Sequence, residues 1–319
     1  MTQSGEKHWH WRWLRKRSGR ITALRSTEPR IGLALGGGFA RGIAHVGVLR
    51  VLERENIPIY CATGVSAGSI VAAAYASGAT VNEIGSAAST MRLSDVAKWG
   101  LSRLGFAGSE RMTPFLQRLL KHMQFDDMKI PLGVIATDIR SGRAIEFRDC
   151  GDVAPAIRAS CSYPGLFRPV EFNGHTLVDG AISVEVPSRL ARKMGATHVI
   201  SVCIPNQAED FEAHHMFEVI NRCFQIMMAN NEDSWRDHSD IVLLPDVGSI
   251  PWDGFENAKR MIEAGEAAAE SALPEIREWI GQSAEVHAAT AASLRATTTE
   301  NSPQSAPAHL QPDQPSCLA

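Results

Sequence analysis

Residues 30–42 read RIGLALGGGFARG, a short apolar run that leads directly into a cluster of glycines. The run over 31–35 predicts a buried β-strand, and the apolar residues of 40–55 recur at helical spacing. The same order then repeats, since 57–62 predicts a second strand and the alanine-rich 67–77 a second helix. Strand, helix, strand, helix indicates a parallel sheet with right-handed crossovers. We therefore expect an α/β fold.

Turn signals divide the rest of the middle of the chain. An Arg-Ser-Gly-Arg turn at 140–143 separates two strand-like runs, which predicts a hairpin over 131–148. Asn173-Gly174 is a strong two-residue turn signal and predicts a second hairpin over 170–178. The other expected elements are buried strands at 198–202 and 240–244 and a helix packed on the sheet at 255–280.

Length and composition limit the domain organisation. The chain has 319 residues with 32 basic and 35 acidic side chains, a net charge of −3 that does not favour nucleic acid as a partner. Its two ends differ in composition from the middle. We expect a basic, tryptophan-rich and flexible N-terminal segment at 1–28, one domain at 29–283, and a disordered polar tail at 284–319.

The N-terminal segment combines charge with aromatic side chains. Between Lys7 and Arg25 there are seven basic residues, three tryptophans and no acid. Indoles prefer the headgroup boundary and basic residues are attracted to anionic lipid, so the segment is suited to peripheral membrane contact. Two other interpretations remain open: a solvated tail, and a segment that caps the fold. Nucleic-acid binding is weaker still.

Cysteine usage and hydropathy indicate the compartment. The six cysteines form no CxxC pair, which disfavours a disulfide framework and a thiolate zinc site. The longest uncharged run, 56–82, contains a proline and several glycines and serines, so we interpret it as a buried βα unit rather than a membrane span. No apolar region follows the basic start, which makes a secretory signal an unfavoured interpretation. We expect a cytoplasmic protein that contacts the inner face of the membrane at most peripherally.

The clearest chemical motif is Gly64-Val65-Ser66-Ala67-Gly68, a G-x-S-x-G placed where a strand ends and a helix begins. Small flanking residues allow a strained turn that exposes the serine hydroxyl, and the helix N-terminus helps to hold developing negative charge. The alternative is a small-residue turn in which Ser66 caps the helix. The position between strand and helix favours a nucleophile.

The glycine loop is the second motif. Read as a dinucleotide fingerprint, its last glycine, Gly42, falls one place late, and read as a phosphate loop it lacks the Lys-Ser/Thr pair. The loop can still present unobstructed backbone N–H groups, which suits an oxyanion hole formed by Gly36, Gly37 and Gly38. Neighbouring strands of a parallel sheet end at one edge, so this loop and Ser66 are expected to meet.

A nucleophilic serine needs a base. Of the histidines, His198 lies at a strand start, His214 and His215 open a predicted helix, and His45 is placed like a packed histidine. Asp179, in Leu177-Val178-Asp179-Gly180-Ala181, is the better candidate because it ends a strand before a glycine. Taken alone, this sequence favours an ordinary Asp-Gly turn over a catalytic base.

Four blocks together resemble the patatin-like phospholipases, serine acyl hydrolases that include the catalytic domain of neuropathy target esterase. The blocks, in the family's order, are Gly36 to Gly42, Gly64 to Gly68, Arg158 to Phe167, and Asp179-Gly180-Ala181. The resemblance covers roughly 31–247. It implies a three-layer α/β fold with a mostly parallel central sheet flanked by helices, a Ser66–Asp179 dyad, oxyanion donors from the glycine loop, and no metal or other cofactor. Arg41 matches the family's basic residue in that loop, and Gly42, Gly64, Gly68 and Gly180 support the motifs.

The resemblance therefore implies a hydrolase of phospholipid or lysophospholipid esters. Apolar residues between Met91 and Phe125 are suited to an acyl-chain groove or a cover, although such spacing is also that of an ordinary core. A membrane-associated adaptor that has lost catalysis is the alternative, and a nucleotide-binding protein is disfavoured by the glycine loop itself. The lipid headgroup, the acyl position cleaved and the oligomeric state do not follow from the sequence.

Overall fold

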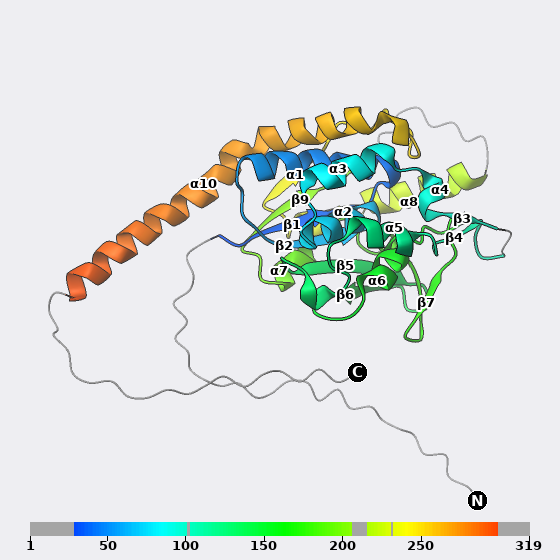
Figure 1. The fold of residues 1–319 in the computed structure, drawn as a ribbon, viewed down its shortest axis with the longest axis horizontal. Coiled ribbons are helices and arrows are strands. Elements are labelled where there is room, and N and C mark those ends of the chain that lie inside the picture. Colours follow the sequence, from blue (N-terminus) through cyan, green and yellow to red (C-terminus); the bar gives the residue numbers. More distant parts are fainter. Residues whose placement is uncertain (1–28, 101–102, 206–215, 231, 299–319) are drawn as a thin grey trace, which may run out of the picture.

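The computed structural model describes residues 29–100, 103–205, 216–230 and 232–298, so the basic N-terminal segment lies outside it. Strands of these residues form one large and one small sheet (Figure 1). The strands are β1 (Ile31–Leu35), β2 (Ile59–Val65), β3 (Lys98–Trp99), β4 (Ala107–Gly108), β5 (Leu132–Asp138), β6 (Arg143–Phe147), β7 (Val170–Phe172), β8 (His175–Asp179), β9 (His198–Val202) and β10 (Ile241–Leu243).

The large sheet has the strand order β10-β9-β1-β2-β5-β8-β7, with β6 paired to β5 as well. The strands from β10 to β5 are parallel, and β6, β7 and β8 join antiparallel. The predicted, mostly parallel α/β sheet is therefore confirmed. Both predicted hairpins are present as β5–β6 and β7–β8, and the second turns at Asn173-Gly174, where both residues have positive φ (48° and 81°).

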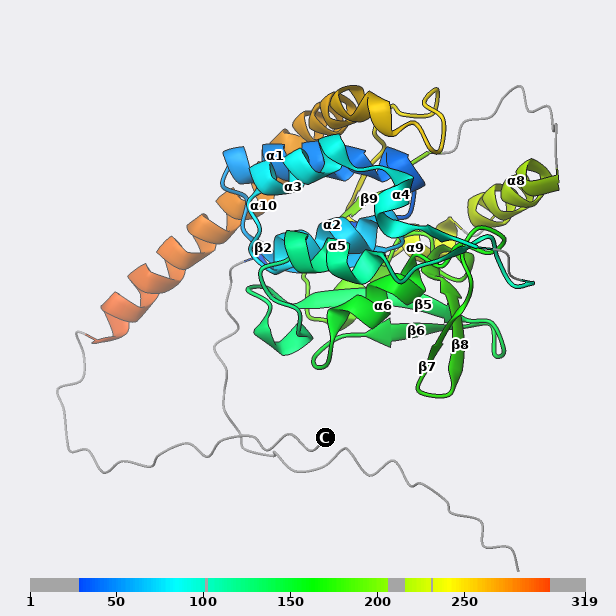
Figure 2. The same ribbon diagram turned by 45° about the vertical axis from the view of Figure 1, so that its right-hand side comes forward.

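Helices cover both faces of the sheet and complete three layers (Figures 1 and 2). On one face α2 packs against β2 and α6 against β5, with α1, α3, α5 and α10 around them; on the other, α7 packs against β1, β2 and β9. The helices are α1 (Ala44–Arg54), α2 (Ala67–Ala76), α3 (Val81–Thr90), α4 (Leu93–Val96), α5 (Met112–Leu119), α6 (Val153–Ser160), α7 (Ser188–Lys193), α8 (Met216–Ala229), α9 (Asp233–Arg236) and α10 (Ala258–Thr298).

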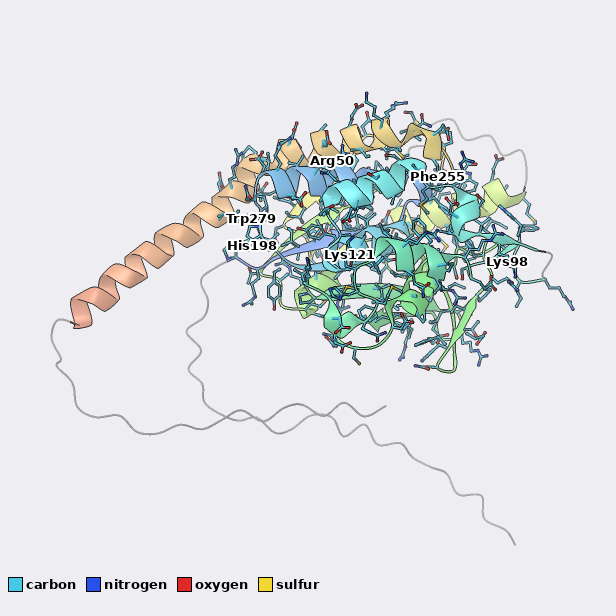
Figure 3. The ribbon with its side chains drawn as sticks, viewed as in Figure 1. Arg50, Lys98, Lys121, His198, Phe255 and Trp279 are labelled. Atoms are coloured by element: carbon cyan, nitrogen blue, oxygen red, sulfur yellow. The ribbon has the colours of Figure 1, made fainter. Side chains whose placement is uncertain are left out.

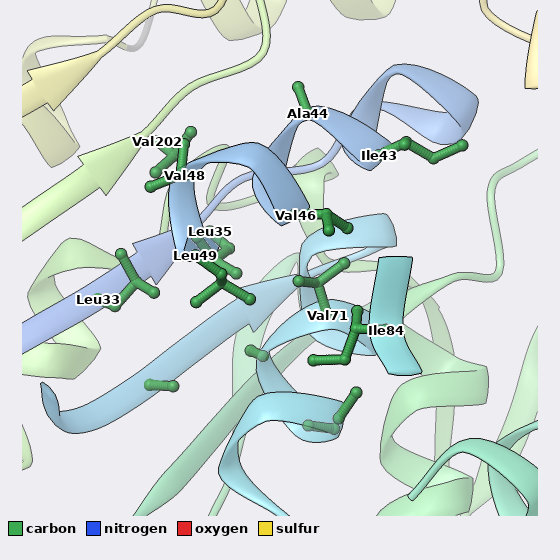
Figure 4. Close-up of a cluster of buried hydrophobic side chains, with 14 of the residues drawn as sticks. Leu33, Leu35, Ile43, Ala44, Val46, Val48, Leu49, Val71, Ile84 and Val202 are labelled. Atoms are coloured by element: carbon green, nitrogen blue, oxygen red, sulfur yellow. The ribbon is translucent and has the colours of Figure 1, made fainter. Parts of the chain in front are cut away.

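Strand β1 shows why this layering follows from the sequence. Leu33 and Leu35 face the layer that contains Val48 and Leu49 of α1, and all four side chains are fully buried (Figure 4). Ala34, between the two leucines, belongs to the smaller core under α7. Burying a leucine contributes roughly 1.5–3 kcal/mol. Since successive strand residues alternate between faces, the apolar run of β1 forms part of both cores at once.

Helix α10 differs from the expectation at its C-terminal end. The sequence predicted a helix over 255–280 and a disordered tail from 284, whereas α10 continues to Thr298. The tail prediction weighed only how much a segment can bury. Alanine-rich residues also have high helix propensity, and a helix that is already packed needs no new nucleation to continue. Residues 299–319 lie outside the described part of the chain.

Packing holds the first part of α10 in place. The helix crosses α1, where Arg50 and Arg54 bond Glu266 and Glu270 at 3.0 and 3.1 Å. Further along, the centroid of the Trp279 ring lies 4.7 Å from that of the His198 ring. Figure 3 shows the two residues side by side. Within the described residues, no helix is both long and apolar enough to cross a membrane.

Candidate active site

The site lies where two strands meet end to end along one edge of β5. Strand β2 runs parallel to β5 and pairs with it as far as Val65 opposite Ile135. Strand β8 runs the other way along the same edge and ends with Asp179 opposite Ala136. Since β6 occupies the other edge over these residues, β2 and β8 must share this one. The residue after β2 is Ser66, which is thereby brought against Asp179.

Ser66 has the strained backbone that the motif predicted. Its φ and ψ are 52° and −127°, a region that non-glycine residues rarely occupy. Two serines hold it there: the Ser66 N–H donates to Ser160 Oγ at 2.8 Å, and Ser69 Oγ donates to the Ser66 carbonyl at 2.6 Å. Ser66 stands at the N-cap position of α2 but its side chain makes no capping hydrogen bond, so the interpretation as a simple cap is wrong.

The Ser66 hydroxyl instead donates to Asp179. Its Oγ lies 2.7 Å from Asp179 Oδ2, and the other carboxyl oxygen accepts the Ala181 N–H at 2.9 Å. Asp179 is 1 % exposed. Burial raises the pKa of Asp179 to about 7, because removal from water disfavours the charged form more than these two hydrogen bonds favour it. A carboxylate tuned in this way is a far better proton acceptor at neutral pH than an ordinary aspartate.

The glycine loop lies directly beside the serine. A Cβ placed on Gly37 would lie 3.4 Å from Ser66 Cβ, so the loop and the serine meet as expected. The Gly36 N–H, however, donates to the Val202 carbonyl at 2.9 Å and continues the pairing of β1 with β9. The prediction that Gly36 supplies an oxyanion donor is therefore wrong. Among the described residues, the N–H groups of Gly37 and Gly38 have no backbone acceptor, and they remain the candidates.

The other motif glycines allow close backbone approach. A Cβ on Gly68 would overlap the Gly36 carbonyl at 2.5 Å, where the start of α2 passes the end of β1. Gly180 is similarly tight against the carbonyl of Ile135 on β5. Side chains at Gly42 and Gly64 would also meet neighbouring atoms, Ala67 Cβ at 2.7 Å and the Gly68 carbonyl at 2.5 Å. The close packing around the serine turn therefore leaves no room for a side chain at these four positions.

The histidines are not placed as bases of Ser66. His198 begins β9, at the opposite end of the parallel strands, and His214 and His215 lie outside the described residues. His45 is fully buried, which lowers its pKa to about 4, so its ring is neutral near pH 7. It donates through Nε2 to the Gly36 carbonyl, 2.9 Å away. His45 therefore supports the glycine loop from behind.

This contact predicts a measurable role in positioning. For the ester hydrolysis that the sequence analysis predicts, we expect His45→Leu to lower kcat about ten-fold or more, because the glycine loop loses the bond that fixes Gly36. His45→Gln retains a donor near the Nε2 position and should recover most of the rate. Neither variant should change the pH dependence of the reaction. A pH profile altered by His45→Gln would instead indicate that the imidazole takes part in proton transfer.

An apolar pocket opens on one side of Ser66. It runs between helices α2, α3, α4 and α5, and its lining includes Ile70, Ile84, Met91, Phe115 and Phe167. Its walls are almost wholly apolar, which suits a hydrocarbon chain. The apolar residues of 91–125, which the sequence analysis considered for a groove or a cover, do not all line this pocket.

Met91, Phe115 and Leu119 line the pocket, whereas Leu116 and Leu120 are buried in the core. Leu104 and Phe106 are exposed, and Leu101 lies outside the described residues. The groove interpretation therefore fits some of the predicted residues, and the core interpretation fits others.

A more polar pocket opens on the other side of the same serine. Arg41, Asp179, Asn221 and Gln225 are among the residues that line it. Phe39 lines both pockets, and its ring lies 4.8 Å from that of Tyr163 and 5.0 Å from that of Trp252. Phe39 and Ser66 are thus shared by the two pockets, and the other two rings line the polar one.

Helix α8 forms part of this site, which sequence reasoning missed. Tyr163 donates through Oη to Asn221 Oδ1 at 2.7 Å, and its ring lies 5.6 Å from that of Phe224. A helix was expected in this part of the sequence, but nothing assigned it to the site. The spacing of Asn221, Phe224, Gln225 and Met228 is the signal that could have found it, since these residues share one helix face.

Ser160 was also missed. It lies within the block 158–167 that carried part of the resemblance, but the sequence analysis gave its hydroxyl no role, and the structure shows that it accepts a hydrogen bond from the Ser66 N–H.

The described residues contain no group of three or more His, Cys, Asp or Glu side chains able to hold a metal ion. All described cysteines are unbridged.

The fold and this geometry define an α/β protein with a buried serine–aspartate pair at the carboxyl edge of its sheet. The model of the patatin-like phospholipase family matches residues 33–192, half of the chain, and the chain belongs to that family.

Among relatives, an uncharacterised NTE-family protein of Mycobacterium tuberculosis is 29 % identical over 204 residues, covering 62 % of this chain and 56 % of its own. Human patatin-like phospholipase domain-containing protein 6 is 32 % identical over 197 residues, covering 57 % of this chain and 14 % of its own. Lysophospholipase NTE1 of Mycosarcoma maydis is 30 % identical over 225 residues, 68 % of this chain and 12 % of its own. The chain thus spans only part of the length of these relatives.

A solved structure, human GIVD cytosolic phospholipase A2 with a fluorophosphonate inhibitor, is 10 % identical with a TM-score of 0.44 over 81 % of this chain and 60 % of its own.

Proposed function

We propose that the protein hydrolyses lipid acyl esters, as a phospholipase A or lysophospholipase, through a Ser66–Asp179 dyad. The observation that carries the proposal is the 2.7 Å hydrogen bond from Ser66 Oγ to Asp179 Oδ2. Membership of the patatin-like phospholipase family supports it. So does the strained turn, which presents the hydroxyl at the junction of the two pockets.

The reaction would proceed through an acyl-enzyme. Ser66 Oγ attacks the ester carbonyl carbon while its proton passes to Asp179 Oδ2. The oxyanion of the tetrahedral intermediate accepts hydrogen bonds from the N–H groups of Gly37 and Gly38. Collapse of the intermediate breaks the bond to the alcohol, which leaves with the proton from Asp179. Water then attacks the acyl-serine, gives its proton to Asp179, and the fatty acid leaves as Ser66 recovers that proton.

The two pockets suggest the orientation of the substrate. The acyl chain would enter the apolar pocket among Ile84, Met91 and Phe115, because its walls offer a hydrocarbon almost no polar atom to desolvate. The alcohol side would face the polar pocket that Arg41, Asn221 and Gln225 line. A cation there favours a substrate whose headgroup carries a phosphate. The printed name of the Mycosarcoma maydis relative, a lysophospholipase, is consistent with this class.

The experiment is fatty-acid release from defined lipids, measured with EDTA and, separately, with added divalent cations. We expect release from lysophospholipid or phospholipid, since the dyad needs no Lewis acid. Cleavage of both substrates, or of either one, would support the proposal. Absence of release with and without added divalent cations, from a folded protein, would contradict it and favour the membrane-associated adaptor. Activity that EDTA removes and one metal restores would contradict the metal-independent mechanism.

A further inference from the structure

Large exposed hydrophobic side chains gather on two elements at one end of the described molecule. One is the β3–β4 hairpin, where Trp99 is 58 % exposed, Leu104 70 % and Phe106 58 %. The other is helix α8. Most side chains of this size lie inside a protein, and a cluster of them on a surface marks an interaction site.

Helix α8 carries apolar residues on the face where a surface helix normally carries polar ones. Its inner face lines the polar pocket of the site through residues such as Asn221 and Gln225. Its outer residues Met216, Val219 and Ile226 are 76 %, 47 % and 48 % exposed. They recur at helical spacing, so they form one stripe. The helix therefore carries apolar side chains on its exposed face as well as on its inner face.

The hairpin is held in a fixed position beside the other pocket. The N–H groups of Phe106 and Ala107 both donate to the Leu166 carbonyl, at 3.1 and 2.9 Å, and the Arg168 N–H donates back to Ala107 at 2.9 Å. The next residue, Phe167, lines the apolar pocket. Each exposed element is thus joined directly to one of the two pockets.

Both elements lie at the end of the molecule where the parallel strands finish. Figure 1 shows α8, β3 and β4 at that end, and Figure 2 shows α8 there in a second view. In Figure 3, Lys98 of the hairpin lies there, far from His198 at the start of β9. Since Ser66 follows the end of β2, the exposed apolar residues are on the side of the catalytic pockets. We call the three hairpin residues and the three α8 residues named above the apolar rim.

Charge distinguishes among partners for this rim. On the hairpin, the described residues between Asp95 and Glu110 include two exposed cations, Lys98 and Arg103, and no acid. On α8, the described stretch from Met216 to Ile226 carries one acid and one base, Glu218 and Arg222, so the rim as a whole has an excess of cations. Indole, other apolar side chains and cations together are the composition of an interfacial anchor: indole prefers the headgroup level and cations attract anionic lipid. A protein partner would cover the side from which the substrate enters, whereas a bilayer would supply the lipid substrate from that side.

We propose that the apolar rim docks the protein onto the surface of an anionic lipid bilayer, with the catalytic pockets facing the lipid. The choice of a bilayer rests on the proposed lipid hydrolysis, while the surface itself rests on the exposed side chains. The rim residues are not part of the sequence segment 1–28, so variants of the rim leave that segment unchanged.

The test measures binding of the full chain to vesicles in a Ser66→Ala background, where no lipid is consumed. We expect the pair Trp99→Ser and Phe106→Ser to weaken co-sedimentation with phosphatidylcholine–phosphatidylserine vesicles about ten-fold or more, because two aromatic side chains no longer leave water. Val219→Ser with Ile226→Ser should act in the same direction. Lys98→Glu should weaken binding to these vesicles but not to phosphatidylcholine alone. Tyr60→Ser is the matched control. Tyr60 is a partly exposed aromatic residue and the second residue of β2, so it lies at the opposite end of the parallel strands from the rim.

Activity measurements separate this proposal from the proposed function. With Ser66 intact, the rim variants should hydrolyse a soluble short-chain ester at the wild-type rate and hydrolyse vesicle lipid more slowly. Unchanged vesicle binding by both pairs of rim variants would overturn the docking proposal, as would a dimer that only the rim variants dissociate. A wild-type protein that binds vesicles through the rim but hydrolyses no ester would instead contradict the proposed function alone.

Discussion

Ser66→Ala is expected to lower ester hydrolysis by at least about a thousand-fold, because the variant has no oxygen to form the acyl-enzyme. The same variant should not react with a fluorophosphonate probe, whereas the wild type should be labelled on Ser66. Mass spectrometry of the labelled peptide identifies the residue. Undiminished labelling or turnover in Ser66→Ala would contradict the assignment of the nucleophile.

A second substitution at this position separates chemistry from strain. Ser66→Gly also removes the hydroxyl, but glycine adopts a φ of 52° without the steric cost that serine or alanine pays. Such backbone strain costs on the order of 1–3 kcal/mol. We therefore expect Ser66→Gly to be inactive yet about 1 kcal/mol more stable than Ser66→Ala in urea unfolding. Equal stability of the two variants would show that the turn is relaxed, and the strained-elbow argument would fail.

The sequence predicted the elements of this site better than their pairing. The strands of the large sheet and its two hairpin turns follow from local signals, such as the apolar run before Gly36 and the Asn173-Gly174 turn, whereas the short strands β3 and β4 were not predicted. What no local signal gives is that β8 enters along the edge of β5 that β2 leaves at Val65. That arrangement depends on pairing between residues far apart in the chain. Only the family resemblance joined Ser66 to Asp179 in advance.

Errors in prediction have equally specific causes. Gly36 was assigned an oxyanion role because it begins the glycine run, but β-pairing with Val202 extends one residue beyond β1 and engages its N–H. Helix α8 was not assigned to the site because it has apolar residues on two faces, so periodicity alone does not tell which face is buried. The continuation of α10 was missed because burial, rather than helix propensity, was used to judge its last turns.

Asp179→Asn is expected to remove nearly all activity while preserving the fold. An amide has almost the same shape, and its oxygen can still accept the Ala181 N–H. Its NH2 group would face Ser66 Oγ and donate to it, so the contact remains but the proton acceptor is lost. The measurement is kcat/KM on a soluble ester, with circular dichroism as the control for folding. Substantial turnover by a folded Asp179→Asn protein would exclude the carboxylate as the base.

The pH dependence gives the sharper form of this prediction. Because burial raises the pKa of Asp179 to about 7, kcat/KM of the wild type should rise with pH and level off above about 7. An aspartate with an ordinary pKa near 3.8 would give a rate that is already constant from about pH 5 upward. A flat profile from pH 5 to 8 would therefore contradict a buried, proton-accepting Asp179.

Stability should change with pH in the opposite direction. The folded protein binds a proton at Asp179 between about pH 4 and pH 7, where the unfolded chain has released it. The free energy of unfolding should therefore fall as pH rises through this window, by on the order of a few kcal/mol, and stay low above it. Asp179→Asn has no charge to bury, so it should lack this fall and exceed the wild type in stability at pH 8. Urea unfolding of both proteins at pH 5 and pH 8 measures the difference. We expect the variant to exceed the wild type in free energy of unfolding by more at pH 8 than at pH 5. At pH 8 the wild-type protein keeps a charged carboxylate buried, which makes it a ready proton acceptor and lowers the stability of the fold.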